Sequence, residues 1–141
     1  MKFPAKIPTI FKYIYPNLTW NLPRKEKVLY LTFDDGPTPE VTEWTLEQLD
    51  KYNANASFFC IGENVERFPN IFEKVKQKGH LIGNHTYRHF NGWEVSNAEY
   101  YEDIARCSRL VRSRFFRPPF GRITPIQLSL IHISEPTRPS I

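Results

Sequence analysis

The sequence has few cysteines and no run of basic residues. Cys60 and Cys107 are its two cysteines, and they lie far apart in the chain. Two cysteines do not make a disulfide framework, and we expect both to be buried free thiols. The 19 Lys and Arg residues contribute to a formal net charge of +4 but are dispersed along the chain. Nucleic-acid binding is therefore not indicated.

A long hydrophobic run is also lacking. The N-terminus is basic, but Lys6, Pro8 and Lys12 interrupt its apolar stretch before it reaches the length of a signal peptide or a membrane span. We therefore expect no membrane span and, for the chain as written, a cytoplasmic protein. What is present is 141 residues with 40% hydrophobic and 15% aromatic content, which is enough for one globular domain with a core.

Strand-like and helix-like segments alternate from Val28 onward, which predicts an α/β fold with parallel strands. Strands are expected at residues 28–33, 56–61, 80–83 and 115–121. Three helices are expected. The first runs from an N-cap at Thr38 to about Tyr52, and the second contains Ile71, Phe72 and Val75 and ends at a cap at Gly79. The third follows a capping box at Ser96 and Glu99. The apolar helix positions are Val41, Trp44, Leu49 and Tyr52 in the first helix, and Tyr100, Ile104, Cys107 and Val111 in the last.

Two adjacent carboxylates, Asp34 and Asp35, follow the first predicted strand, and Gly36 and Pro37 then turn the chain. Neighbouring strand residues point to opposite faces, so two adjacent Asp side chains can share a site only where the strand ends and bends. Asp-Gly-Pro is also ordinary turn chemistry. Each of the other candidate polar segments lies just after a strand as well, where parallel α/β sheets place their active sites.

His85 and His89 are four residues apart, so on a helical turn both imidazoles would face the same way and could share a metal ion. The alternative is that each histidine is simply half-buried. With Asp35 as a third ligand, two His and one Asp would leave open positions on a divalent ion, as in a catalytic site. Asp34 could then take a proton from water activated by the ion. Arg117 could pair with Asp34 and keep it ionised, or it could be a solvated residue at a strand end.

Three segments together resemble the first three motifs of the polysaccharide deacetylase family, also called the NodB homology domain or carbohydrate esterase family 4. They are Thr32-Phe33-Asp34-Asp35-Gly36-Pro37, His85-Thr86-Tyr87-Arg88-His89 and Arg117-Pro118-Pro119-Phe120-Gly121. The resemblance covers roughly residues 27–127. It implies a distorted (β/α) barrel that removes N-acetyl or O-acetyl groups from a carbohydrate. The implied partner is an acetylated glycan or oligosaccharide.

The resemblance also implies a role for each residue. Asp34 would be the general base, and Arg117 would tune it. Asp35, His85 and His89 would hold a divalent metal, commonly Zn²⁺ in this family. The backbone N–H of Phe120 would help to stabilise the tetrahedral oxyanion. Two aromatic residues near this site, Tyr87 and Trp93, could stack on a sugar ring, although packing is the more common role for such side chains.

The family's fourth and fifth motifs, which include the general-acid histidine, lie downstream of the third, and the chain ends before they would appear. We therefore expect the N-terminal half of the barrel, at residues 27–127, preceded by an extension at residues 1–26. Residues 128–141 resemble a translated sequencing-library adapter, and the Leu130-Ile131-His132 within them follows the third motif too closely to be the fifth. We expect such a chain to be at most weakly active.

Two other classes of function use similar residues. Non-haem iron oxygenases also use two His and one carboxylate, but their sites usually sit on an all-β scaffold. A non-catalytic carbohydrate-binding or scaffold domain is the second alternative. Such a domain would usually lack the base or a ligand in the first two motifs, and this chain has both.

Overall fold

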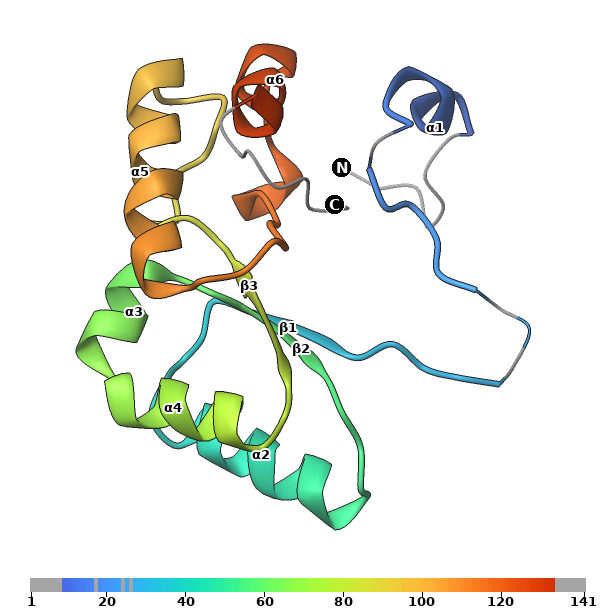
Figure 1. Cartoon of the computed structure of the whole chain (residues 1–141), viewed down its shortest axis with the longest axis vertical. Coiled ribbons are helices and arrows are strands. Elements are labelled where there is room, and N and C mark those ends of the chain that lie inside the picture. The colour runs from blue at the N-terminus through green and yellow to red at the C-terminus, as the bar shows by residue number, and fades with distance from the viewer. Residues whose placement is uncertain (1–8, 17, 24, 26, 134–141) are drawn as a thin grey trace.

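The computed structural model of the chain describes residues 9–16, 18–23, 25 and 27–133, and their centre is a three-stranded parallel sheet (Figure 1). The strands are β1 (Thr32–Asp34), β2 (Ser57–Cys60) and β3 (Leu81–Asn84), in the order β1-β2-β3. Phe33 pairs with Phe58, and Phe58 pairs with Ile82, so the three strands end at the same edge. The parallel α/β fold predicted from the sequence is confirmed.

Helices connect the strands and extend beyond them (Figure 1). They are α1 (Ile10–Ile14), α2 (Val41–Lys51), α3 (Gly62–Arg67), α4 (Pro69–Gln77), α5 (Asn97–Leu110), a 3-10 turn η1 (Pro119–Gly121) and α6 (Pro125–Ile133). Helix α5 contacts α3, β3 and α6, whereas α4 contacts α2, α3 and β3. None of the helices in the described part of the chain is long and apolar enough to cross a membrane.

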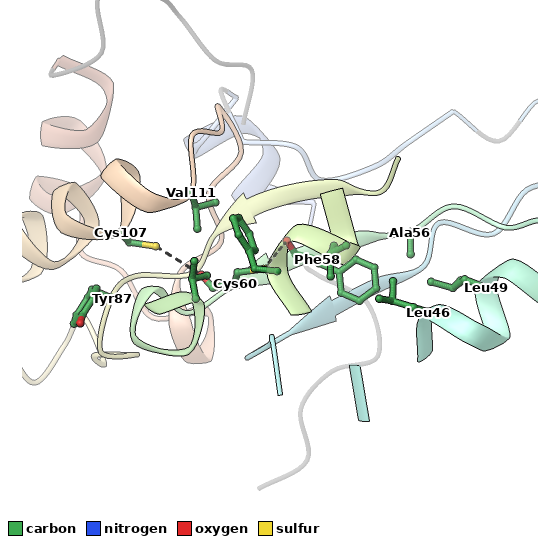
Figure 2. Close-up of a cluster of buried hydrophobic side chains, with 11 residues drawn as sticks. Leu46, Leu49, Ala56, Phe58, Cys60, Tyr87, Cys107 and Val111 are labelled. Carbon is green, nitrogen blue, oxygen red and sulfur yellow. Dashed lines mark hydrogen bonds between the residues drawn. The ribbon is translucent and has the colours of Figure 1, made fainter. Parts of the chain in front are cut away.

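The hydrophobic core lies between the sheet and its helices. Figure 2 shows it extending from Leu46 and Leu49 on α2, past Phe58 on β2, to Cys107 and Tyr87 at the far end. The alternation of side chains along β2 explains this placement, because Phe58 and Cys60 are two residues apart and point to the same face of the sheet, where the core lies. Phe33 stacks on Phe58 with ring centroids 5.1 Å apart, which continues the core onto β1.

The two cysteines are buried free thiols, as predicted. Each thiol contacts a carbonyl oxygen 3.7 Å away, that of Phe58 for Cys60 and that of Cys60 for Cys107 (Figure 2). Burial raises the pKa of both thiols to about 12. Both side chains are therefore neutral and act as small apolar residues of the core.

The first and last predicted strands are shorter than the sequence suggested. Residues 28–31 are exposed and lie outside β1, which begins where Leu31 O accepts a hydrogen bond from Ser57 N. The predicted strand at residues 115–121 is reduced to one parallel bridge between Asn84 and Phe116, after which the chain turns into η1. In both segments the apolar pattern is present, but the strand extends only as far as it has a neighbour to pair with.

Helix α2 differs from its prediction at its start and in the face that it buries. It begins at Val41, not directly after Thr38, because Glu40 adopts a left-handed backbone with φ of 62°. Its buried residues are Thr42, Thr45, Leu46 and Leu49, while Val41, Trp44 and Tyr52 are exposed. Two threonines therefore occupy the inner face where larger apolar residues had been expected, which the apolar pattern alone could not show.

Other predicted elements hold. Helix α4 ends where Gly79 adopts a φ of 76°, and α5 begins with the capping box of Ser96 and Glu99. The four apolar positions predicted for α5 and its C-cap are all buried. Helix α3 was not predicted, because its six residues have no clear apolar period. Helix α6 crosses the boundary predicted at residue 127. The predicted domain limits, including the non-native tail at residues 128–141, stay predictions, and residues 134–141 lie outside the described residues.

His80 is a buried polar side chain without a hydrogen bond in the described part of the chain. His80 precedes β3, is 7% exposed and packs against the Phe58 ring, and neither of its ring nitrogens has a hydrogen-bond partner among the described residues. Burial lowers the pKa of His80, an effect that nearby Asp50 opposes and Lys78 reinforces. The folded state therefore favours the neutral ring.

We expect His80 to make the fold acid-sensitive. Because the pKa of His80 is lower in the folded than in the unfolded chain, its contribution is present above the unfolded value of about 6.5 and is lost as pH falls through the folded value. The His80→Leu variant should therefore lose less stability than the parent between about pH 7.5 and pH 5.5. Urea unfolding of both metal-free proteins at both pH values measures this. Equal losses would contradict it.

Candidate metal centre

The predicted site residues line one cavity of about 330 Å³ at the C-terminal edge of the sheet. Asp34 and Asp35 come from the end of β1, His85 and His89 from the loop after β3, and Arg117 and Phe120 from the segment that bridges to β3. Parallel pairing produces this meeting, because it places the carboxyl ends of all strands at one edge. The structure thus brings together all six residues that the sequence selected.

Asp34 is the last residue of β1, and its carboxylate is ion-paired. Arg117 Nη1 donates to Asp34 Oδ1 at 2.7 Å and to Thr32 Oγ1 at 3.0 Å. The guanidinium also lies 4.0 Å from the centroid of the Phe59 ring. These three contacts fix Arg117 above the sheet, so it is not a freely solvated residue. A charge-assisted hydrogen bond of this length fixes the orientation of the carboxylate.

Asp35, His85 and His89 form a compact group of three donor side chains. Asp35 Oδ1 lies 3.3 Å from His85 Nε2 and 3.1 Å from His89 Nε2. The three donor atoms lie within 4.8 Å of one another. Two imidazoles and one carboxylate are a ligand set suited to zinc or another divalent transition metal. The exposed Asp35 side chain leaves one side of the group open to the cavity.

The hydrogen bonding of His85 fits a metal ligand. Its Nδ1 lies 2.7 Å from the carbonyl oxygen of Arg117, which can only accept, so Nδ1 carries the proton. Burial lowers the pKa of His85 and favours the neutral ring. Nε2 is then a lone-pair donor that faces the Asp35 oxygen at 3.3 Å. Two acceptors at that distance repel unless a proton or a cation lies between them.

The residues His85–His89, here called the histidine loop, do not form the helical turn that was predicted. They form bends after β3, and Thr86 and His89 have positive φ values of 64° and 60°. The two rings nevertheless converge, with centroids 5.0 Å apart. The two histidines therefore reach a common site from a folded loop and not from one turn of helix, because Thr86 and His89 do not have the right-handed helical conformation.

Left-handed backbone is concentrated at this site. Of the six non-glycine residues with positive φ in the described ranges, four lie in the cavity wall or the histidine loop; they are Asp35, Thr86, His89 and Phe120. Each such residue costs roughly 1–2 kcal/mol, and the cost is highest for a β-branched side chain such as Thr86. Strain of this kind persists only where surrounding contacts enforce it.

The aromatic candidates occupy different environments. Phe120 is 65% exposed, lines the cavity and contacts the His89 ring edge-on at a centroid distance of 4.7 Å. Tyr87 is buried, and its hydroxyl donates to Glu66 Oε2 at 2.6 Å, so its role is packing and not sugar stacking. Trp93 is 65% exposed beside Arg122 and does not line the cavity.

Two residues near the site were missed by the sequence analysis. Asn64 Nδ2 donates to the backbone carbonyl of Asp35 at 2.8 Å. Asp103 Oδ2 accepts from the backbone N–H groups of Tyr87 and Arg88, each at 2.8 Å. Asp103 carries a signal that could have been used, because it is an acidic residue on the otherwise apolar face of α5. Asn64 carries none.

Comparison with known proteins identifies the family. The polysaccharide deacetylase family matches residues 21–131, whereas the resemblance in the sequence was placed at residues 27–127. A peptidoglycan-N-acetylglucosamine deacetylase of Bacillus cereus is 40% identical over 123 residues, covering 83% of this chain and 44% of that protein. A chitooligosaccharide deacetylase of Azorhizobium caulinodans is 34% identical over 105 residues, covering 70% of this chain and 50% of that protein.

The fold agrees with this assignment. The crystal structure of the Bc1960 peptidoglycan N-acetylglucosamine deacetylase superposes with a TM-score of 0.79 at 38% identity, covering 86% of this chain and 60% of that one. The chain belongs to the polysaccharide deacetylase family. It has the α/β fold of the family's deacetylases, and it spans about half the length of the curated relatives described above. The iron oxygenase alternative is not supported, because the site stands on a parallel α/β sheet.

We expect the three donors to bind one Zn²⁺ ion per chain. Loss of a residue that only hydrogen-bonds to a ligand typically weakens metal binding by roughly 10- to 100-fold. His89→Ala should weaken Zn²⁺ binding by more than this, because it removes a ligand itself. Isothermal titration calorimetry measures the stoichiometry and the affinity. The matched control is His80→Leu, which removes a histidine at the opposite end of β3 and should leave the affinity unchanged. Similar affinity in the His89→Ala variant and the parent would contradict the assignment.

Proposed function

We propose that this chain provides a metal-dependent deacetylase site, which hydrolyses an N-acetyl or O-acetyl group on a carbohydrate and releases acetate. The observation that carries the proposal is the convergence of Asp35, His85 and His89 next to a second, ion-paired carboxylate in one cavity. A turn would need only one of the two aspartates. Membership of the polysaccharide deacetylase family supports the same reaction.

Asp35, His85 and His89 would hold the metal, and Zn²⁺ is the proposed ion because it accepts this mixed nitrogen and oxygen ligand set. Such an ion would supply Lewis-acid polarisation of the acetyl carbonyl and would lower the pKa of a nearby water. His85 is prepared for this role, because its Nδ1–H is held by the Arg117 carbonyl and its Nε2 faces the group.

Asp34 is the proposed general base. Its Oδ1 accepts from Arg117 Nη1, while its Oδ2 has no hydrogen-bond partner among the residues that the structure describes. Asp34 also lines the cavity. The ion pair with Arg117 holds the Asp34 carboxylate in place at the cavity wall. Asp34 would take a proton from the attacking water at Oδ2, while Oδ1 keeps its bond to Arg117.

Phe120 is proposed to bind the developing oxyanion through its backbone N–H. Support comes from its place in the cavity wall and from its left-handed backbone, with φ of 58°, between Pro119 and Gly121. A backbone donor fixed by such a turn needs no reorganisation during the reaction. The exposed ring, in contact with His89, leaves the entrance to the cavity partly apolar.

The proposed substrate class is an acetylated glycan or oligosaccharide. The two curated relatives described above are named for peptidoglycan N-acetylglucosamine and for chitooligosaccharide. The cavity of about 330 Å³ has room for one acetylamino group of a longer polymer, which could enter from the exposed Asp35 side. Peptidoglycan fragments and acetylated chito-oligosaccharides are therefore the first substrates to test.

We expect Asp34→Asn to keep the metal and lose turnover. Asparagine retains the shape of Asp34 but cannot accept a proton, so acetate release should fall by roughly 10²- to 10⁴-fold. Zn²⁺ affinity should stay close to that of the parent, because Asp34 is not among the three donors. Acetate is measured by an enzyme-coupled assay on acetylated chito-oligosaccharides over long incubation, and Zn²⁺ by calorimetry.

The control for this variant is Asp50→Asn, which changes an exposed carboxylate on α2 that pairs with Lys78 and should not affect turnover. Parental acetate release by Asp34→Asn would overturn the role of Asp34. A parent that binds the oligosaccharide and Zn²⁺ but releases no acetate would instead favour the non-catalytic carbohydrate-binding alternative.

A further inference from the structure

The histidine loop needs an external restraint. Thr86 and His89 both hold positive φ, and Thr86 is a β-branched residue for which that conformation is strongly disfavoured. The loop has no regular hydrogen bonds of its own, so its backbone groups must find partners elsewhere. Its carbonyl oxygens find them on α3, where Gly62 N donates to Thr86 O and Glu63 N donates to Tyr87 O, each at 3.0 Å.

The N–H groups at the middle of the loop are held by Asp103. Its Oδ2 accepts from Tyr87 N and Arg88 N at 2.8 Å each, and the side chain is buried at 5% exposure. A carboxylate that accepts two backbone N–H groups makes stronger hydrogen bonds than a neutral acceptor. Without it, two N–H groups in a largely buried place would lose their partners at once.

The two bonds lie between the two histidine ligands. His85 has its own support, through Nδ1 and the Arg117 carbonyl. His89 has less: in the described part of the chain its side chain contacts Asp35, the His85 ring and the exposed Phe120 ring, and it makes no further hydrogen bond. The direction of the His89 ring is therefore set mainly by its backbone, which the Asp103 bonds fix one and two residues earlier.

The same helix also supports the strand end just before the loop. Asn84 Nδ2 donates to Ile104 O at 3.1 Å and to Ser108 Oγ at 2.9 Å on α5, and Asn84 Oδ1 accepts from Thr86 N at 2.8 Å. Helix α5 thus supports this region through a short polar strip on its apolar face, formed by Asp103, the Ile104 carbonyl and Ser108. Asp103 is the only charged residue in that strip.

We propose that Asp103 is a positioning residue for the metal centre, and that it acts by locking the backbone between His85 and His89 so that both rings converge on Asp35. The inference rests on the proposed function. Asp103 has no contact with the three donor atoms and acts only through Tyr87 N and Arg88 N. Its removal should lower metal affinity without removing any ligand.

The test is Co²⁺ and Zn²⁺ titration of three variants. Asp103→Ala should weaken binding by about 10- to 100-fold and change the visible absorption spectrum of bound Co²⁺, because the ligand geometry relaxes. Asp103→Asn keeps an acceptor oxygen in the same place and should restore most of both properties, even if the alanine variant folds poorly. Glu102→Ala, an exposed acidic neighbour on the same helix, should match the parent.

Amide hydrogen exchange gives a reading that does not depend on metal. Tyr87 and Arg88 should exchange faster in the metal-free Asp103→Ala chain, whereas the amides of α2 should not change. Parental affinity and an unchanged Co²⁺ spectrum in Asp103→Ala would overturn this inference alone. If only Asp103→Asn folds, the inference is overturned when Tyr87 and Arg88 exchange faster in that variant while its metal affinity and Co²⁺ spectrum equal those of the parent. A parent chain that binds neither metal would overturn the metal site of the proposed function and this inference with it.

Discussion

The site depends on chain reversals at the ends of parallel strands. Parallel pairing brings β1 and β3 to the same edge, but a strand that simply continued would carry its side chains away from that edge. Asp35 and His89 instead adopt left-handed backbone, with φ of 69° and 60°, and so turn their side chains back over the sheet. The unfavourable local conformation is thus the condition for convergence, and the rest of the site is built to maintain it.

Two helices supply the contacts that maintain it. The first residues of α3 donate to the carbonyl groups of the histidine loop, and α5 accepts from its N–H groups through Asp103. Gly62 makes the close approach of α3 possible, because a Cβ at that position would lie 2.5 Å from Tyr87 Cδ2 and 3.2 Å from Tyr87 Cα. Tyr87 is then anchored by Glu66 and by Arg106, whose guanidinium lies 3.5 Å from the centre of its ring. Packing and hydrogen bonding thus fix the same loop from both sides.

The sequence predicted which residues meet better than how they meet. Motif positions follow from strand ends, and strand ends follow from apolar runs broken by Gly and Pro, so Asp34, His85 and Arg117 could be placed on one edge. The helical turn expected for His85 and His89 was wrong, because the restraint on that loop comes from α3 and α5, which are distant in the sequence. The inner face of α2 was wrong for a similar reason, since Thr42 and Thr45 are buried by tertiary packing that apolar periodicity does not describe.

The two neighbouring aspartates differ because they lie on opposite sides of the point where β1 ends. Asp34 still follows the strand alternation and shares a face with Thr32, so its carboxylate meets Arg117, which lies over Phe59 on that same face. That face lines a second, larger cavity of about 880 Å³, together with Leu18, Trp20 and neighbouring residues of the N-terminal segment. Asp35 has left the alternation and turns toward the histidines. One change of backbone hand, at Asp35, therefore separates a carboxylate that pairs with Arg117 from one that faces the two histidines, although the two side chains are chemically identical.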